Sequence, residues 1–293
     1  MKSISSLNRV KTVLVLTLLA ALPAWLGAPV FADSPHLKLG NPSHATSDTS
    51  QKDNFLMEKS FFALSYNNTK ATPNWVSWHL TINELGSAPR FSFHPDEELP
   101  AGFTQILPKD YTGGGFDRGH MCPHSDRGAD DDMSEATFVM SNIIPQSPHV
   151  NQKAWAQLEM YCRDLVENQG KTLYIICGPA GQGGEGSKGQ SDVIGKNDHK
   201  VVVPAKCWKV IMVLDDGPGD DVEKVDAHTR LIAVIMPNDM SVGEEWAGFR
   251  VSVKAVEELT GYKFFDQVPD SIIGPLKEKT DQVRIPHAKP IQH

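Results

Sequence analysis

One short segment, Phe116–His124, combines the residue types that acid–base chemistry needs. Within it, His120 follows a glycine and is preceded by an arginine and an aspartate. An imidazole titrates near neutral pH, so a histidine in this setting can take a proton from water. Two other interpretations use the same residues: a buried histidine bonded to a carbonyl, or a zinc site shared with His124 and Cys122. Pro123 disfavours a single helical turn that carries both histidines, which weakens the zinc interpretation.

A second pattern consists of four residues spaced four apart: Asn151, Trp155, Glu159 and Arg163. In an α-helix a step of four residues turns by only about 40°, so these side chains lie along one stripe. Taken alone, the stripe favours an ordinary solvated ion pair between Glu159 and Arg163, worth roughly a few tenths of a kcal/mol. Its three polar members nevertheless form one ridge beside the apolar face of the helix.

The elements that position these residues follow from hydrophobic periodicity. Residues 150–169 contain no glycine or proline, carry apolar residues at helical spacing and stop at Gly170, which predicts an amphipathic helix. Strands are predicted where β-branched and aromatic residues alternate or cluster, and a second helix follows them. The predicted strands are the alternating run Val76, Trp78, Leu80 and Ile82, then residues 172–177, residues 201–203 continuing after Pro204 into 207–214, and residues 231–236, and the second helix is 253–260. Together they predict a single α+β domain over residues 61–268.

Both ends of the chain are predicted to lie outside this domain. In residues 1–32, basic residues precede an apolar run that ends in small residues, as in a cleavable secretory signal. Pro23 interrupts the run, which is shorter than the roughly 20 residues of a spanning helix, so a retained membrane anchor is disfavoured. Residues 33–60 are polar and predict a flexible leader, and residues 269–293 predict a loose tail. We therefore expect a secreted or periplasmic protein, cleaved near Ala32 and free of the membrane.

The net charge of the chain argues against one mode of binding nucleic acid. Its 293 residues carry 28 Lys and Arg against 36 Asp and Glu, a formal net charge of −8. Such an average argues against a protein that coats nucleic acid by bulk attraction. Residues 171–209 are locally different, because they hold six lysines against three acidic residues, a net of +3. The charge therefore argues against binding by bulk attraction, but it leaves room for a local basic surface.

Export would make four cysteines eligible for disulfides: Cys122, Cys162, Cys177 and Cys207. Four cysteines allow three pairings, and the sequence does not choose among them. Buried free thiols are the alternative. A disulfide at Cys122 or Cys162 would tie the segment of His120, or the helix, to a rigid neighbour, and we state this as a hypothesis.

Taken in order, three blocks of the chain resemble the DNA/RNA non-specific endonuclease family, which includes secreted sugar-non-specific nucleases and relatives of mitochondrial endonuclease G. The blocks are Asp117-Arg118-Gly119-His120, Ser141-Asn142-Ile143-Ile144-Pro145-Gln146, and the helix stripe from Asn151 to Arg163. Any one block is a weak signal, whereas their order and spacing together are specific. Weaker matches extend the resemblance to about residues 61–266. It implies a ββα-metal (His-Me finger) fold with a central antiparallel sheet flanked by helices.

The resemblance also implies roles for individual residues. His120 would be the general base, with its second ring nitrogen held by a backbone carbonyl. Asn151 would be the one direct protein ligand of a divalent cation, and Mg²⁺ suits it because that ion prefers oxygen and keeps several waters, with Mn²⁺ as a substitute. Glu159 would orient a water of the cation. The other implied residues are Arg163, Arg118 and Arg90 as phosphate contacts, and Asp117 and Asn142 as positioning residues.

The implied activity is hydrolysis of DNA and RNA without strong sequence preference, leaving 5′-phosphate ends. Phosphate contacts carry no direct sequence information, and attack by external water needs no 2′-hydroxyl. Two alternatives remain at this point: a related phosphodiesterase of narrower nucleotide range, and a nucleic-acid-binding protein that is catalytically silent. No oligomeric state is predicted.

Overall fold

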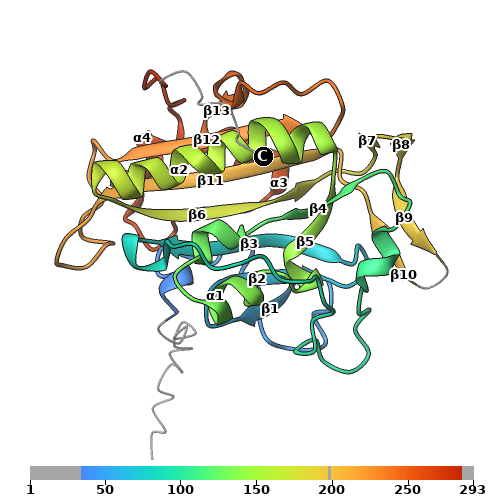
Figure 1. Cartoon of the computed structure of the whole chain (residues 1–293). Coiled ribbons are helices and arrows are strands. Elements are labelled where there is room, and N and C mark those ends of the chain that lie inside the picture. The colour runs from blue at the N-terminus through green and yellow to red at the C-terminus, as the bar shows by residue number, and fades with distance from the viewer. Residues whose placement is uncertain (1–33, 197–198, 286–293) are drawn as a thin grey trace, which may run out of the picture. The chain divides into compact units, whose positions relative to one another are not determined.

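The computed structural model describes residues 34–196 and 199–285. The centre of this part of the chain is a seven-stranded sheet with the order β1-β2-β3-β6-β11-β12-β13, antiparallel throughout (Figure 1). Its strands are β1 Phe55–Glu58, β2 Ala63–Asn67, β3 Thr72–Leu80, β6 Lys171–Ala180, β11 Lys206–Asp215, β12 Arg230–Pro237 and β13 Arg250–Val251. The predicted α+β class with a central antiparallel sheet is confirmed.

Helices cover both faces of this sheet. α2 (Ala156–Gln169) packs on one face, and α3 (Val253–Thr260) and α4 (Asp270–Lys277) pack on the other (Figure 1). Because side chains alternate along a strand, neighbouring residues of β3 serve opposite cores. Trp78 lies in the core beneath α2, and Trp75 lies in the core beneath α3 and α4. The sheet is therefore a two-sided support for whatever α2 carries.

Three short ribbons and one further helix complete the described elements. The ribbons pair β4 with β5, β7 with β8 and β9 with β10. Their bounds are β4 Asp117–His120, β5 Ile143–Gln146, β7 Gly184–Gly186, β8 Gly189–Ser191, β9 Val193–Lys196 and β10 His199–Val202, and α1 is Asp131–Ala136. Short 3-10 turns connect them, of which Pro108–Tyr111 and His124–Arg127 flank the site.

The predicted helix over residues 150–169 forms, with one local variation. It begins as a π-helical segment, Val150–Trp155, and continues as α2 to Gln169. Gly170 ends it in the left-handed region, at φ +59°, and its N–H donates to the Leu165 carbonyl. π-Helical segments often lie at functional sites. The second predicted helix, 253–260, matches α3.

One predicted strand is wrong. Residues 201–203 do not continue into β11, because β10 ends at Val202 and pairs with β9 in a separate ribbon. Pro204 has no N–H to donate, so the ladder stops there and β11 begins at Lys206. Val201 and Val203 are buried in a small third core instead.

The predicted flexible leader, residues 33–60, is wrong over its described part. Leu37 and Leu39 are buried in the core beneath α3 and α4, and the Ser77 hydroxyl donates to the His36 carbonyl at 2.6 Å. A few apolar residues suffice here because they cover a sheet face that would otherwise meet water. The same covering buries β3 on both sides, whereas the alternation predicted one buried face.

The predicted loose tail, residues 269–293, is also wrong as far as residue 285. Ile273 and Leu276 of α4 are buried in the core that α3 covers. Arg230 donates to both oxygens of Asp281, at 2.9 and 2.8 Å. Residues 286–293 and the predicted signal segment lie outside the described residues. No helix within the described ranges is long and apolar enough to cross a membrane.

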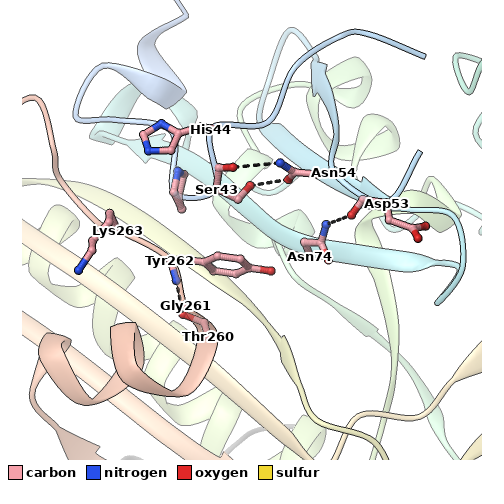
Figure 2. A pocket seen from close by; sticks show the side chains of 10 residues that line it. Ser43, His44, Asp53, Asn54, Asn74, Thr260, Gly261, Tyr262 and Lys263 are labelled. Atoms are coloured by element: carbon pink, nitrogen blue, oxygen red, sulfur yellow. Dashed lines mark hydrogen bonds between the residues drawn. The ribbon is translucent and has the colours of Figure 1, made fainter. Parts of the chain in front are cut away.

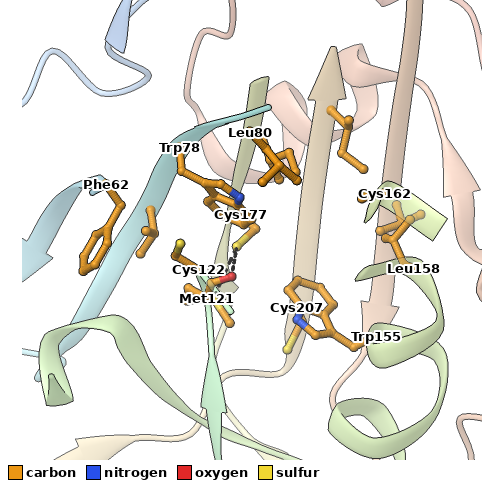
Figure 3. Packing of buried hydrophobic residues seen from close by; sticks show 14 of the residues in the cluster. Phe62, Trp78, Leu80, Met121, Cys122, Trp155, Leu158, Cys162, Cys177 and Cys207 are labelled. Carbon is orange, nitrogen blue, oxygen red and sulfur yellow. Dashed lines mark hydrogen bonds between the residues drawn. The ribbon is translucent and has the colours of Figure 1, made fainter. Parts of the chain in front are cut away.

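The disulfide hypothesis is wrong for this structure. All four cysteines are free and buried within the core beneath α2, as Figure 3 shows. The Cys177 thiol donates to the Met121 carbonyl at 3.4 Å. Burial raises the pKa of Cys122, Cys162 and Cys207 to about 12, which keeps these groups protonated and poorly reactive.

Candidate active site

The three sequence blocks assemble into one ββα unit. β4 carries the block from Asp117 to His120 and pairs antiparallel with β5, so that Gly119 lies opposite Ile144. The chain then enters the π-helical segment at Val150, with Asn151 in its first turn, and continues into α2. Residues that are more than 30 positions apart in the sequence thus meet on one ribbon and one helix.

Gly119 shows why this ribbon needs a glycine beside the histidine. A Cβ atom built there would lie 2.6 Å from Cβ of Gln146 and would also overlap its amide oxygen. That clash is with the base of a buried side chain, so it cannot be relieved by a small rotation. A glycine is required for β4 and β5 to pack closely.

His120 is enclosed by aromatic rings. Its ring centroid lies 4.8 Å from that of Phe138, in an edge-on arrangement, and 5.2 Å from that of Phe93. Its buried Nε2 makes no hydrogen bond within the described residues. Burial, followed by the charges of Arg90 and His124, lowers the pKa of His120 to about 3. The imidazole is therefore neutral at neutral pH, so one of its ring nitrogens carries a free lone pair.

The expected carbonyl partner of His120 is not found in the described part of the chain, where packing holds the ring instead. The backbone next to it is held by Asn142, as the positioning role requires. The buried Asn142 amide donates to the carbonyls of Cys122 and Thr137, each at 2.8 Å, and accepts from the Cys122 N–H at 2.9 Å. It clamps the chain two residues after His120.

Two arginines lie on the rings that enclose His120. The Arg118 guanidinium lies 5.4 Å from the centre of the Phe93 ring and donates twice to the Pro108 carbonyl, at 3.2 and 2.7 Å. Arg90 is exposed, with its guanidinium 5.4 Å from the centre of the Phe138 ring. Two of the three predicted phosphate contacts, Arg118 and Arg90, are therefore brought to the histidine.

Asp117 fixes the orientation of Asn151. The Asn151 amide nitrogen donates to Oδ2 of Asp117 at 2.8 Å, and the Gln152 amide donates to the same oxygen at 2.8 Å. This leaves Oδ1 of Asn151 with no hydrogen-bond partner among the described residues. A fixed amide oxygen of this kind suits a hard divalent cation that keeps most of its waters.

The zinc interpretation has no support in this geometry. No cluster of three or more His, Cys, Asp or Glu side chains in residues 34–196 and 199–285 is placed to share a metal ion. Cys122 faces the apolar core, and the rings of His120 and His124 have centroids 6.3 Å apart. The donor set therefore fits one amide ligand with water better than a histidine–cysteine cage.

The expected Glu159–Arg163 ion pair is replaced by two pairs to other elements. Glu159 Oε1 lies 3.5 Å from the Lys209 ammonium on β11. Arg163 donates to Asp126 Oδ1 at 2.9 Å, in the 3-10 turn that follows the histidine segment. α2 is thus bound to the sheet by one charge and to the histidine segment by another.

Lys209 and Asp126 were missed by the sequence reasoning. Lys209 had a signal, because it is the one charged residue in the apolar run 207–214. Burial opposes its charge, but the surrounding anionic groups, Glu159 first, raise the pKa of Lys209, so it stays an ammonium. Asp126 had no signal, since its partners, Arg163 and the Trp78 indole at 3.0 Å, are distant in sequence.

A separate pocket of about 370 Å³ lies between the N-terminal segment and the loop after α3 (Figure 2). Its polar groups are largely bonded to one another: Ser43 Oγ donates to Asn54 Oδ1 at 2.6 Å, and Asn74 Nδ2 donates to the Asp53 carbonyl at 2.7 Å. None of the predicted site residues lines it, so it is distinct from the ββα unit.

Comparison with known proteins adds independent findings. Residues 39–271 match the family described as DNA/RNA non-specific endonuclease. A nuclease of Nostoc sp. is 46% identical over 249 residues, covering 85% of this chain and 86% of that protein. Mitochondrial endonuclease G of Bos taurus is 30% identical over 260 residues, covering 85% and 79%. The crystal structure of the EndoG/EndoGI complex aligns with a TM-score of 0.65 at 26% identity, over 81% of this chain and 92% of that chain.

Proposed function

Because this chain belongs to the DNA/RNA non-specific endonuclease family, and is thereby a hydrolase that acts on nucleic acids, we propose that it is a secreted, Mg²⁺-dependent endonuclease for both DNA and RNA. The observation that carries this proposal is the ββα unit itself. It combines a neutral His120 that makes no side-chain hydrogen bond within the described residues and an Asn151 whose carbonyl oxygen is fixed and unpartnered among them.

His120 has the central role in the proposed reaction. A water oxygen attacks the phosphorus while its proton passes to the free ring nitrogen of the His120 imidazole. Arg118 and Arg90, as permanently charged planar donors, bind the non-bridging phosphate oxygens. The bond to the 3′ oxygen breaks as the new bond forms, and the leaving oxygen takes a proton from solvent water, so the products carry a 3′-hydroxyl and a 5′-phosphate.

Asn151 would hold the cation through Oδ1, because Asp117 binds the amide nitrogen and leaves that oxygen available. When bound, the cation supplies positive charge where negative charge develops on the leaving oxygen. Glu159 would orient one of its waters, and Arg163 would brace the phosphate from the next turn of α2. We propose Mg²⁺, with Mn²⁺ able to replace it, because the donors are hard oxygens.

The breadth of substrate and the location are part of the same proposal. Arginine and amide contacts to phosphate do not read base edges, so sequence preference is expected to be weak. Attack by external water does not use the 2′-hydroxyl, so DNA and RNA are both accepted. The basic and apolar pattern of residues 1–32 supports export with cleavage near Ala32.

Digestion of plasmid DNA and ribosomal RNA tests the proposal. With Mg²⁺ or Mn²⁺ the protein should cut both polymers, and EDTA should stop it. The new 5′ ends should accept a phosphate label from a polynucleotide kinase only after phosphatase treatment. His120→Ala should lower the rate by about 10²-fold or more while leaving the thermal unfolding curve in place. His228→Ala is the control, because that histidine lies outside the ββα unit.

Other outcomes would contradict the proposal or indicate one of the alternative functions. Failure to cut either polymer with Mg²⁺ or Mn²⁺ contradicts the proposal. Cleavage of small nucleotide diesters alone indicates a narrower phosphodiesterase, and binding without cleavage indicates a silent binding protein. Cleavage by His120→Ala at the parent rate contradicts the assigned base.

A further inference from the structure

Lys209 is a buried cation at the centre of the sheet. Its side chain is 1% exposed, and it pairs with Cys177 on β6 and Val234 on β12. The flanking residues on the same face of β11, Cys207 and Ile211, belong to the apolar core beneath α2. Placing an ammonium there is costly unless specific partners compensate it.

Two of those partners, Glu159 and Trp155, belong to the helix over residues 150–169, and the third, Trp78, lies on β3. The ammonium lies 3.5 Å from Glu159 Oε1, 4.2 Å from the centre of the Trp155 ring and 5.6 Å from that of Trp78. Trp155 and Glu159 follow Asn151 on the same stripe, at successive steps of four residues. Lys209 therefore contacts the row of side chains that ends at the proposed cation ligand.

The contact is made to one end of the Glu159 carboxylate. Oε1 faces the ammonium, and no described residue donates a hydrogen bond to Oε2. Glu159 keeps 15% of its side chain exposed, while Lys209 is enclosed. The pair thus bridges the dry core and the accessible side of α2.

We propose that Lys209 is a positioning residue for the nuclease reaction: by binding Oε1 and supporting Trp155, it turns Oε2 of Glu159 toward the cation and its waters. This inference rests on the proposed function. It differs from a purely structural salt bridge, which apolar residues often replace without loss of function.

The test compares Lys209→Met with a matched variant, Lys277→Met. Lys277 also forms a buried pair with a glutamate, Glu257 at 2.9 Å, but on the α3–α4 side of the sheet. For each variant we would measure kcat, KM, Mg²⁺ affinity by calorimetry without substrate, and Tm. Lys209→Met should lower kcat and Mg²⁺ affinity roughly tenfold each, with KM changed less than about threefold. Lys277→Met should lower Tm and leave kcat and Mg²⁺ affinity within about twofold.

Glu159→Gln shows whether Lys209 acts through this carboxylate. In the Glu159→Gln background, adding Lys209→Met should change kcat and Mg²⁺ affinity by less than about twofold, since the group to be positioned is already gone. The double variant also lacks a buried unpaired carboxylate, so it is the comparison to use if Lys209→Met alone does not fold. A further tenfold loss in the double variant would overturn the proposal.

The proposed function and the role of Lys209 are contradicted by different results. Parent protein that cuts no nucleic acid with any divalent cation contradicts the proposed function. Parent protein that cuts, together with Lys209→Met that keeps parental kcat and Mg²⁺ affinity, contradicts the role of Lys209 alone. Equal losses in Lys209→Met and Lys277→Met would indicate a general effect of lost stability and would also overturn it.

Discussion

At the scale of single residues, the site depends on side chains that the fold keeps in an unusual state. His120 is kept neutral by burial among aromatic rings, and the amide of Asn151 is held by one carboxylate oxygen of Asp117. Neither state follows from residue type, because an exposed histidine titrates near pH 6.5 and an exposed amide rotates freely. The reactivity of these residues is therefore a property of their neighbours.

The pH dependence of cleavage should report the state of His120. Its pKa is lowered to about 3 in the folded protein, mainly by burial, so protonation inactivates it only at strongly acid pH. We expect kcat/KM, measured at saturating Mg²⁺, to show no loss from His120 between pH 8 and about 5. In the unfolded chain the histidine takes its proton near pH 6.5, so the free energy of unfolding should fall below that pH. A half-loss of kcat/KM at pH 6.5 that His124→Gln does not remove would contradict this assignment.

At the scale of elements, long-range pairs join the ββα unit to the rest of the fold. Asp126 connects the histidine segment to α2, and Lys209 connects α2 to the sheet. The N-terminal segment also contributes, because the Lys59 ammonium lies 3.0 Å from Asp96, which accepts a hydrogen bond from Ser141 beside Asn142. The residues expected to be a leader are thus part of the support of the site.

The folded state of this segment can be tested by a single truncation. Leu39 is buried in the core beneath α3 and α4, so Leu39→Ala should lower the free energy of unfolding by about 2–5 kcal/mol. Thr49→Ala, in an exposed part of the same segment, should change it by less than about 0.5 kcal/mol. Chemical denaturation measures both. Equal and negligible effects would support a flexible leader instead.

At the scale of the whole molecule, the acidic average hides a local basic surface. The exposed lysines Lys188, Lys196 and Lys200 lie on or beside the β7–β8 and β9–β10 ribbons. The second ribbon contacts the turn Pro108–Tyr111, through His199 and Asp110 at 3.4 Å, and that turn holds Arg118. The lysine-rich stretch is therefore placed next to a proposed phosphate contact.

This placement predicts a selective effect on salt dependence. Lys196→Ala with Lys200→Ala should weaken binding of DNA to a His120→Ala background and reduce the slope of log K against log salt by roughly 1 to 2. Lys263→Ala with Lys279→Ala changes the net charge equally on the α3–α4 side and should leave the slope unchanged. A slope near zero in the parent, or equal changes in both double variants, would contradict a localised binding face.

The sequence alone determined what depends on neighbours along the chain. Helical spacing and Gly170 defined the site helix, and the order of three blocks identified the ββα unit with His120 and Asn151 in place. Tertiary structure alone decided what depends on which surfaces are covered. It ordered the N-terminal segment, kept the cysteines as buried thiols and paired Glu159 with Lys209 rather than with Arg163. The reason is physical: local propensity acts over a few residues, whereas burial and ion pairing depend on residues that only folding brings together.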